Sequence, residues 1–230
     1  MFAKAPVAGT VKTRLADAVG ASEAAALYEG FIGDTAETIV AAAPGRAVLA
    51  YAGDRAHPGF DVPRRLGFEF VPQPAGDLGA RLDGVFGELA ATSETVTVVG
   101  SDSPTLQPAR LLEARERLAG HEVVVGPSFD GGYYLLGVRS RWFLQTSSPE
   151  QIHPLFRDVS WSTGDVLGQT LSRCRAMSCL CDLIGFWYDV DTIEDLDLLT
   201  THLLDYLRYT GQDVAPRTTA NVFARRDRSH

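Results

Sequence analysis

Short hydrophobic stretches alternate with longer stretches of helical spacing along most of the chain. The short stretches cover residues 46–52, 68–71, 95–100, 122–126 and 133–138 and are rich in Val, Phe, Tyr and Leu. Strands that alternate with helices are typical of an α/β protein with a mostly parallel sheet. We therefore predict such a sheet, with "TVTVVG" (95–100) as a central strand because it is continuous and β-branched.

Helices are predicted between these strands from apolar residues at helical spacing. Each begins at a residue type that favours a helix start. These residues are Ser22, Asp77, Pro108, Ser162 or Thr163, and Thr192 or Ile193. Segment 53–67 is predicted to be a polar loop, and the last helix to stop at Gly211.

The chain length and the last segment set the domain organisation. A chain of 230 residues with 45% hydrophobic residues suits one soluble domain with a sizeable core. We place this domain at residues 1–210. Segment 211–230 has little apolar periodicity, so we predict a loosely attached, flexible tail, or alternatively an arm that contacts a second copy.

Charge and targeting signals narrow the class of protein. The net charge of -8 argues against nucleic-acid binding, which requires clustered Lys and Arg, but it leaves room for one basic pocket for a small nucleotide. No apolar run is long enough to span a membrane, and no signal peptide is visible at Met1. The three cysteines, Cys174, Cys179 and Cys181, fit a reducing compartment better than a disulfide framework. We therefore expect a cytoplasmic protein.

The opening stretch "AKAPVAGTVKTRLADAVG" (3–20) combines a flexible Gly9 with the cations Lys12 and Arg14. It is not a P-loop, because Val11 stands where that motif requires glycine. A helix that begins near Thr13 would add a favourable dipole for an anion, and Arg14 could bind a phosphate through two donors. The alternative is an ordinary basic loop in solvent.

Two acidic segments are candidates for a divalent cation. Asp102 follows the strand that ends at Gly100, where open α/β sheets bind ligands. In "YDVDT" (188–192), Asp189 and Asp191 alternate with apolar residues and should point to one side. Carboxylates together with substrate phosphates are the usual ligands of Mg²⁺. The alternatives are helix caps or solvated carboxylates, although Pro104 disfavours a cap at Asp102.

The stretch "PSFDGGYYLLG" (127–137) carries a turn between two strands. Asp130 and Gly131 are typical of a hairpin, which is the simplest interpretation. Alternatively, Gly131 and Gly132 allow a ligand to approach the backbone beside Tyr133. Trp161 precedes a predicted helix and is either core or a pocket wall.

Together these motifs resemble a known family. "FAKAPVAGTVKTRL", "GDLGARL", "GSDSPTL", "GPSFDGGYYLLG", "WST" and "YDVDT" follow the order found in small bacterial GT-A-type transferases, the radical-SAM or selenodomain-associated group and the arsenosugar-type glycosyltransferases. More distantly, Lys12–Leu15 and Asp189–Thr192 are similar to motifs of the 2-phospho-lactate guanylyltransferases. The resemblance implies a single-domain, Rossmann-like three-layer sandwich with the nucleotide-diphospho-sugar transferase fold.

The resemblance also implies roles for individual residues. It makes Lys12, Arg14 and Asp102 catalytic, and Asp102 with Asp191 or Asp189 ligands of Mg²⁺ or Mn²⁺. It assigns nucleotide binding to Ala5, Pro6, Gly9, Thr10, Lys12, Arg14, Gln73, Gly76, Asp77, Leu78 and Gly79. It assigns the small-molecule acceptor to Asp130, Gly131, Gly132, Tyr133 and Trp161.

Two reactions are consistent with these residues. Glycosyl transfer from a nucleotide-sugar to a small acceptor is favoured by the closer resemblance. Nucleotidyl transfer, in which a phosphorylated small molecule attacks a nucleoside triphosphate and pyrophosphate leaves, is favoured by the two cations Lys12 and Arg14. A nucleotide sensor without turnover is a third hypothesis. The strand before the opening loop is very short, which leaves the anchoring of this loop in question.

Overall fold

Seven strands form in the part of the chain that the computed structural model describes, residues 1–42, 46–148 and 150–228. The contacts divide the chain into two units. Unit 1 comprises Met1–Phe70, Gly100–Pro108 and Asp189–His230, and unit 2 comprises Val71–Val99 and Ala109–Tyr188. Helices and strands alternate along much of the chain, so the predicted α/β class is confirmed.

Unit 1 contains a sheet in the order β1-β2-β3. The strands are β1 (Phe2–Lys4), β2 (Val48–Ala52) and β3 (Glu69–Pro72), whose last two residues belong to unit 2. β1 is only three residues long, yet it pairs in parallel with β2, with Ala3 opposite Tyr51. The short first strand therefore anchors the opening loop to a buried neighbour, since Ala5 continues the pairing by donating to the carbonyl of Ala52 at 2.8 Å.

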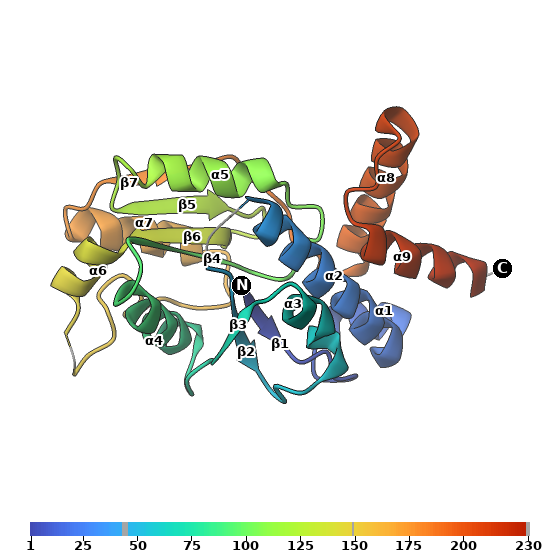
Figure 1. Ribbon diagram of the computed structural model, residues 1–230, viewed down its shortest axis with the longest axis horizontal. Coiled ribbons are helices and arrows are strands. Elements are labelled where there is room, and N and C mark those ends of the chain that lie inside the picture. Colours follow the sequence, from blue (N-terminus) through green and yellow to red (C-terminus); the bar gives the residue numbers. More distant parts are fainter. Residues whose placement is uncertain (43–45, 149, 229–230) are drawn as a thin grey trace. The chain divides into compact units, whose positions relative to one another are not determined.

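Most helices of unit 1 pack against the long helix α2 (Figure 1). Leu27, Phe31 and Ile32 of α2 are fully buried, because apolar residues at helical spacing face the core. The helices are α1 (Thr13–Val19), α2 (Ala21–Ala42), the 3-10 turn η1 (Pro58–Phe60), α3 (Asp61–Arg65), α8 (Ile193–Thr210) and α9 (Pro216–Arg228).

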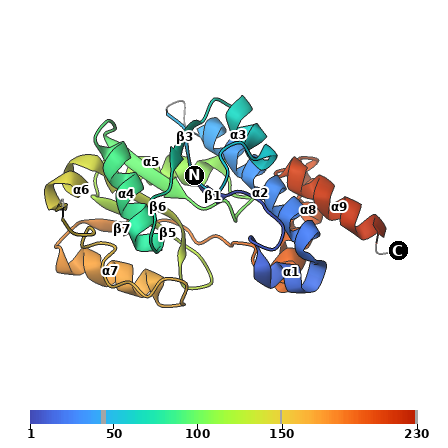
Figure 2. The same cartoon turned by 90° about the horizontal axis from the view of Figure 1, so that it is seen from below.

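The predicted loosely attached tail is wrong for its described part. Residues Pro216–Arg228 form α9, which packs against α2 (Figure 2). The buried carboxylate of Asp34 accepts hydrogen bonds from the backbone N–H groups of Arg217 at 3.2 Å and Thr218 at 2.9 Å. Apolar periodicity within 211–230 is too weak to predict this helix. What holds its first turn is a tertiary contact, the carboxylate on α2, which local sequence does not report. Residues 229 and 230 lie outside the described residues.

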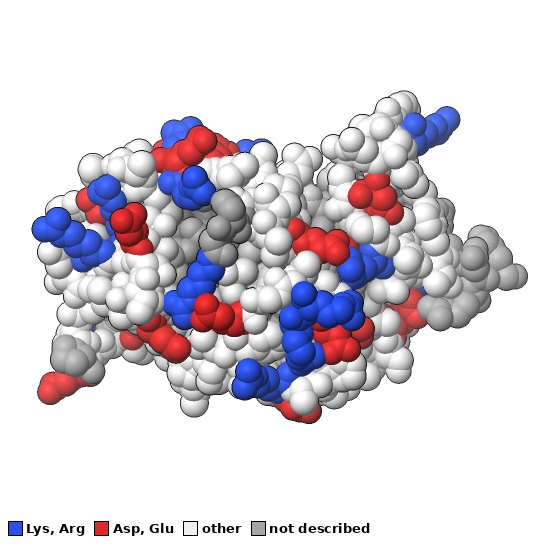
Figure 3. Space-filling view, viewed as in Figure 1, with Lys and Arg blue, Asp and Glu red and all other residues white. Residues whose placement is uncertain are grey.

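Charges on the surface of unit 1 are partly paired. On the face shown in Figure 3, basic side chains lie beside acidic ones. Arg46 and Glu69 form an ion pair at 2.7 Å, and Arg64 pairs with Asp61. Such exposed pairs are screened by solvent and contribute little to stability.

Unit 2 contains a sheet in the order β4-β6-β5-β7. β6 is antiparallel to both β4 and β5, whereas β7 is parallel to β5, so three of the four strands run in one direction. The strands are β4 (Thr95–Val99), β5 (Val123–Pro127), β6 (Tyr133–Arg139) and β7 (Cys181–Leu183). This sheet is therefore mixed, with most of its strands running in one direction as predicted, and the Asp130-Gly131 segment makes the predicted hairpin turn between β5 and β6.

Helices lie on both sides of this sheet. Figure 1 shows α4 and α6 together on one side and α5 on the other. Phe86, Phe143 and Phe156 pack around one another in the core, with ring centroids between 5.7 and 6.2 Å apart. The helices are α4 (Leu78–Ala90), α5 (Pro108–Arg117), α6 (Ser140–Thr146) and α7 (Val166–Ala176).

Most predicted boundaries agree with the structure within a few residues, but four segments differ. The predicted polar loop 53–67 contains η1 and α3, and α6 and β7 were not predicted. The helix predicted from Ser162 or Thr163 begins at Val166, because Ser162 adopts a left-handed backbone with φ 65°. No helix within the described residues is long and apolar enough to cross a membrane.

His153 gives the core of unit 2 a dependence on pH. It is fully buried, its Nδ1 accepts from the backbone of Leu155 at 3.1 Å, and its Nε2 lies 2.8 Å from the hydroxyl of Thr146. Burial lowers the pKa of His153 to about 4. The folded state therefore keeps the ring neutral at a pH where the unfolded chain binds a proton.

We expect the free energy of unfolding to fall as the pH drops from about 6.5 to 4, by up to about 1.4 kcal/mol per pH unit from this group. Chemical denaturation at several pH values measures this slope. His153→Gln should flatten it, whereas the matched variant His121→Gln should keep it. Equal slopes in wild type and His153→Gln would contradict the assignment.

Candidate functional site

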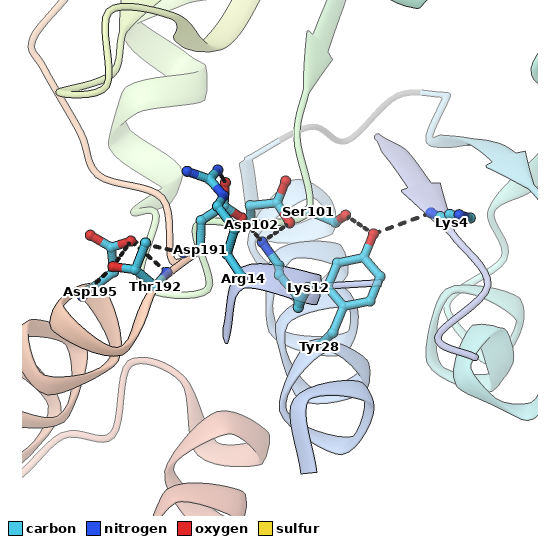
Figure 4. Close-up of polar contacts among 9 residues, drawn as sticks. All are labelled: Lys4, Lys12, Arg14, Tyr28, Ser101, Asp102, Asp191, Thr192 and Asp195. Atoms are coloured by element: carbon cyan, nitrogen blue, oxygen red, sulfur yellow. Dashed lines mark hydrogen bonds and ion pairs between the residues drawn. The ribbon is translucent and has the colours of Figure 1, made fainter. Parts of the chain in front are cut away.

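The ammonium group of Lys12 lies between two carboxylates of unit 1 (Figure 4). Its Nζ is 2.5 Å from Oδ1 of Asp102 and 2.7 Å from Oδ1 of Asp191. Arg14 pairs with the other carboxylate oxygen of Asp191. Segments that are widely separated in the sequence thus bring two cations and two carboxylates to one place.

The backbone around Lys12 orients its side chain inward. Lys12 is the N-cap residue of α1 and has a left-handed conformation with φ 47°, which is uncommon for a residue other than glycine. Its side chain is only 4% exposed, and its ammonium lies 5.5 Å from the ring centre of Tyr28 and 5.9 Å from that of Phe31. The side chain is therefore held by packing as well as by charge, which favours a role in a site over a solvated loop.

Asp102 is placed by the end of β4. The strand stops at Val99, and the loop Gly100–Pro108 enters unit 1. The carbonyl of Asp102 accepts from the backbone N–H of Val190 at 2.9 Å, which joins this loop to the segment that carries Asp191. The preceding Ser101 is buried, and its hydroxyl lies 2.8 Å from that of Tyr28.

Asp191 is oriented by the start of α8. Thr192 is the N-cap, as predicted, and it forms a capping box with Asp195. The carboxylate of Asp195 accepts from the backbone N–H groups of Asp191 at 3.0 Å and Thr192 at 2.8 Å. These bonds fix the backbone of Asp191, so its side chain is free to contact Lys12 and Arg14.

The opposite charges of Lys12 and the two carboxylates shift the pKa of Lys12 and of Asp191 towards their charged forms. Burial alone would lower the pKa of Lys12, but Asp102 and Asp191 outweigh it and raise this pKa above its ordinary value. Burial would raise the pKa of Asp191, but Lys12 and Arg14 together hold it below its ordinary value. Both groups are therefore charged at neutral pH. Burial, with the charge of Asp102 adding to it, raises the pKa of Tyr28 to about 12, so its hydroxyl stays protonated.

The donor set fits a divalent cation that a substrate helps to bind. The Oδ1 atoms of Asp102 and Asp191 both lie against one positively charged nitrogen, so their oxygens already converge on the place of a cation. Among the described residues no three His, Cys, Asp or Glu side chains come together as a metal site. Two carboxylates are nevertheless the usual protein contribution to a Mg²⁺ site that phosphates complete.

The other opening-loop residues predicted to bind the nucleotide precede Lys12 in the chain. Ala5 and Pro6 are buried, and Gly9 is exposed with φ 77°. Thr10 closes a turn by donating to the carbonyl of Val7 at 2.9 Å. Asp189, the other predicted metal ligand of the late segment, is partly buried.

The predicted nucleotide-binding turn after β3 belongs to unit 2. Gln73 and Gly76 follow β3, and Asp77 caps α4 as predicted, accepting from the backbone of Ala80 at 2.9 Å. Leu78 is exposed. Gly79 lies against Trp161, since a Cβ at Gly79 would come within 2.7 Å of the indole nitrogen. The structure thus brings Trp161 to the turn that holds Asp77 and Gly79.

The predicted acceptor turn also lies in unit 2. Asp130 accepts from the backbone N–H of Gly132 at 2.9 Å and from the hydroxyl of Ser128. Gly131 has φ 88°, and a Cβ there would lie 2.1 Å from the carbonyl of Gly164, so this position requires glycine. The Tyr133 hydroxyl is buried, and burial raises its pKa above the ordinary value.

Tyr28 and Ser101 contribute to the site but were not predicted from the sequence. Tyr28 contributes the ring over which Lys12 lies, and its hydroxyl accepts from the backbone N–H of Lys4 at 3.2 Å. No local motif marks Tyr28, which appears in the sequence as one more apolar residue of a long helix. Ser101 stands directly before Asp102, and this position was the only feature of the sequence that could have marked Ser101 as part of the site.

Solved structures with this fold define its class. A protein from Desulfovibrio desulfuricans G20, named "putative nucleotide-diphospho-sugar transferase", matches with 28% identity and a TM-score of 0.80, covering 98% of this chain and 93% of that chain. CMP:2-keto-3-deoxy-manno-octonic acid synthetase complexed with CTP matches at 11% identity and TM-score 0.54, covering 90% and 97% of the two chains. A cytidylyltransferase from Leptospira borgpetersenii serovar Hardjo-bovis (strain JB197) matches at 10% identity and TM-score 0.54, covering 86% and 84%. The chain therefore has the nucleotide-diphospho-sugar transferase fold.

The family follows from the sequence itself. Residues 35–163 match the family described as "Uncharacterized protein conserved in bacteria (DUF2064)", and the chain belongs to this family. None of the curated proteins matches it. The predicted membership in a small bacterial family with the GT-A-like fold is thus confirmed.

Proposed function

We propose that this protein is a metal-dependent transferase that uses a nucleotide-diphospho-sugar and transfers the sugar to a small acceptor. The observation that carries the proposal is the convergence of Lys12, Arg14, Asp102 and Asp191 just after the carboxyl end of β4. Open α/β sheets bind ligands outside the carboxyl ends of their strands. The similarity to the D. desulfuricans protein over nearly the whole chain supports the same class of substrate.

In this proposal Asp102 and Asp191 hold Mg²⁺ or Mn²⁺. When bound, the ion would neutralise charge on the diphosphate. Since Lys12 already lies between the two carboxylates, it must share them with the ion or move towards a phosphate oxygen. A pair of cations suits a leaving diphosphate, and Arg14, whose side chain is 68% exposed, can reach a substrate from the solvent side.

The proposal also includes the residues predicted to bind the rest of the nucleotide and the acceptor. Gln73 and the turn Gly76–Gly79 bind the nucleotide, and Asp130–Tyr133 with Trp161 bind the acceptor. The capped start of α4 offers backbone N–H groups of the kind that bind polar ligand groups, which supports the first assignment. The close approach of Trp161 to Gly79 supports a shared surface for part of the substrate.

Nucleotidyl transfer is the second candidate. It is favoured by the two cations beside the carboxylate pair, because a triphosphate carries more negative charge than a diphosphate. In that reaction a phosphorylated acceptor would attack the α-phosphorus of a nucleoside triphosphate, and pyrophosphate would leave.

The test compares two sets of substrates in the presence of Mn²⁺. One set contains nucleotide-diphospho-sugars with a panel of small acceptors, and the other contains nucleoside triphosphates with sugar phosphates. Release of a nucleoside diphosphate from the first set supports glycosyl transfer. Release of pyrophosphate from the second set alone would replace it with nucleotidyl transfer. Binding without turnover in both sets would favour a nucleotide sensor.

A further inference from the structure

All three cysteines of the chain lie together at one place in unit 2, outside the proposed transferase site. Cys174 is near the end of α7, Cys181 is the first residue of β7, and Cys179 lies in the turn between them. We call these residues the thiol cluster. Three side chains of the same reactive type in one turn require a separate account, because the proposed reaction uses none of them.

The backbone brings the thiols together. Ser178 has a left-handed conformation with φ 53°, which reverses the chain after α7. The N–H of Cys179 then donates to the carbonyl of Cys174 at 3.1 Å. Cys181 is held on the same side by the pairing of β7 with β5, opposite Val123. The turn after α7 and the pairing of β7 therefore place Cys174, Cys179 and Cys181 at one junction of unit 2.

The three thiols differ in accessibility and ionisation. Cys174 is 1% exposed, whereas Cys179 and Cys181 are partly exposed. The hydrogen bonds to Cys179 and Cys181, and burial after them, raise the pKa of the Cys174 thiol above its ordinary value. The bond from Cys174 lowers the pKa of Cys179 and of Cys181. The lowered pKa favours the thiolate form of these two partly exposed cysteines, and the thiolate is the form that reacts with a disulfide.

We propose that the thiol cluster is a site of reversible oxidation in which Cys179 and Cys174 form a disulfide by exchange with a small-molecule disulfide. The pair Cys174–Cys179 is favoured because their backbones are directly hydrogen-bonded, which keeps the two residues within the separation a disulfide needs.

The exchange has two steps. The Cys179 thiolate attacks one sulfur of the small disulfide, a mixed disulfide forms, and one small thiolate leaves. Cys174 then gives its proton to the small thiolate released in the first step, attacks the Cys179 sulfur, and releases the second small thiolate. Two protein thiols are oxidised by two electrons, and the small disulfide is reduced to two thiols.

The experiment incubates the reduced, full-length protein with oxidised glutathione and counts free thiols after denaturation. The count should fall from three to one. Cleavage after Arg175 separates Cys174 from the other two cysteines, and cleavage after Leu180 separates Cys179 from Cys181. Mass spectrometry of the unreduced fragments then identifies the pair. A protein that keeps all three thiols, or one that links Cys174 to Cys181, would overturn the proposal.

Single variants assign the roles. Cys174→Ser should trap the mixed disulfide of Cys179 with glutathione, and Cys179→Ser should keep both remaining thiols free. Cys181→Ser is the matched control and should still form the Cys174–Cys179 bond. Because Cys174 is buried and its variant could fold poorly, Cys179→Ser at a partly exposed position provides the decisive comparison. Oxidation of Cys179→Ser at the wild-type rate would contradict the assignment.

Discussion

Lys12→Met is expected to lower the turnover of the proposed transferase by about 10²–10³-fold, because it removes a buried cation from the place where phosphate charge must be neutralised. Methionine keeps much of the length of the side chain and its packing against Tyr28 and Phe31. The loss should therefore appear in turnover and in nucleotide affinity. Steady-state kinetics with the substrate found in the assay above, together with a nucleotide titration, measure both.

The same variant also tests the position of Lys12 between two carboxylates. Without its ammonium, Asp102 and Asp191 repel each other, so the affinity for Mn²⁺ alone should rise, as measured by electron paramagnetic resonance. Lys4→Met is the matched control, because Lys4 is exposed and its ammonium donates to a loop carbonyl, that of Thr10 at 2.9 Å. If both variants behaved like wild type, Lys12 would have no part in the site.

Asp191→Asn is expected to weaken Mn²⁺-dependent nucleotide binding by roughly 10–100-fold, since hydrogen bonds to charged groups contribute about 1.5–3 kcal/mol. The change keeps the shape of the side chain but removes the charge that both Lys12 and Arg14 contact. Nucleotide titrations by calorimetry, with and without Mn²⁺, separate the metal-dependent part from the rest.

Asp102→Asn should show the same loss if both carboxylates bind the ion. Asp17→Asn provides the matched control, because Asp17 is an exposed residue of the neighbouring helix α1. Nucleotide binding that survives both Asp191→Asn and Asp102→Asn, with no dependence on Mn²⁺, would favour the sensor hypothesis over a transferase. Loss of binding in Asp17→Asn would indicate a general effect of charge instead.

Elements with strong local signals were predictable from the sequence. The β-branched run at 95–99 is β4, and Thr192 followed by an acidic residue three positions later forms the capping box of α8. Apolar spacing likewise identified α2. In these segments the local preference and the buried face agree, so tertiary packing does not alter the outcome.

Segments with weak or mixed signals were not predictable. α9 has few apolar residues, and its packing depends on the carboxylate of Asp34 on a distant helix. β7 has only three residues, and its pairing with β5 defines it as a strand. α7 begins later than predicted because the backbone at Ser162 is left-handed, which the residue type does not indicate.

The opening loop, the end of β4 and the segment before α8 could be identified as candidate phosphate and metal segments from their residue types alone, because cations near a helix start and carboxylates after strands have known chemistry. Sequence by itself also determined the alternation of strands and helices, through hydrophobic periodicity. Only the tertiary structure decided that Lys12 lies between Asp102 and Asp191, the second of these 179 positions away, with Tyr28 beneath its side chain. The reason is physical: periodicity reports which face of a segment is buried, whereas the meeting of distant charges depends on how the buried faces pack together.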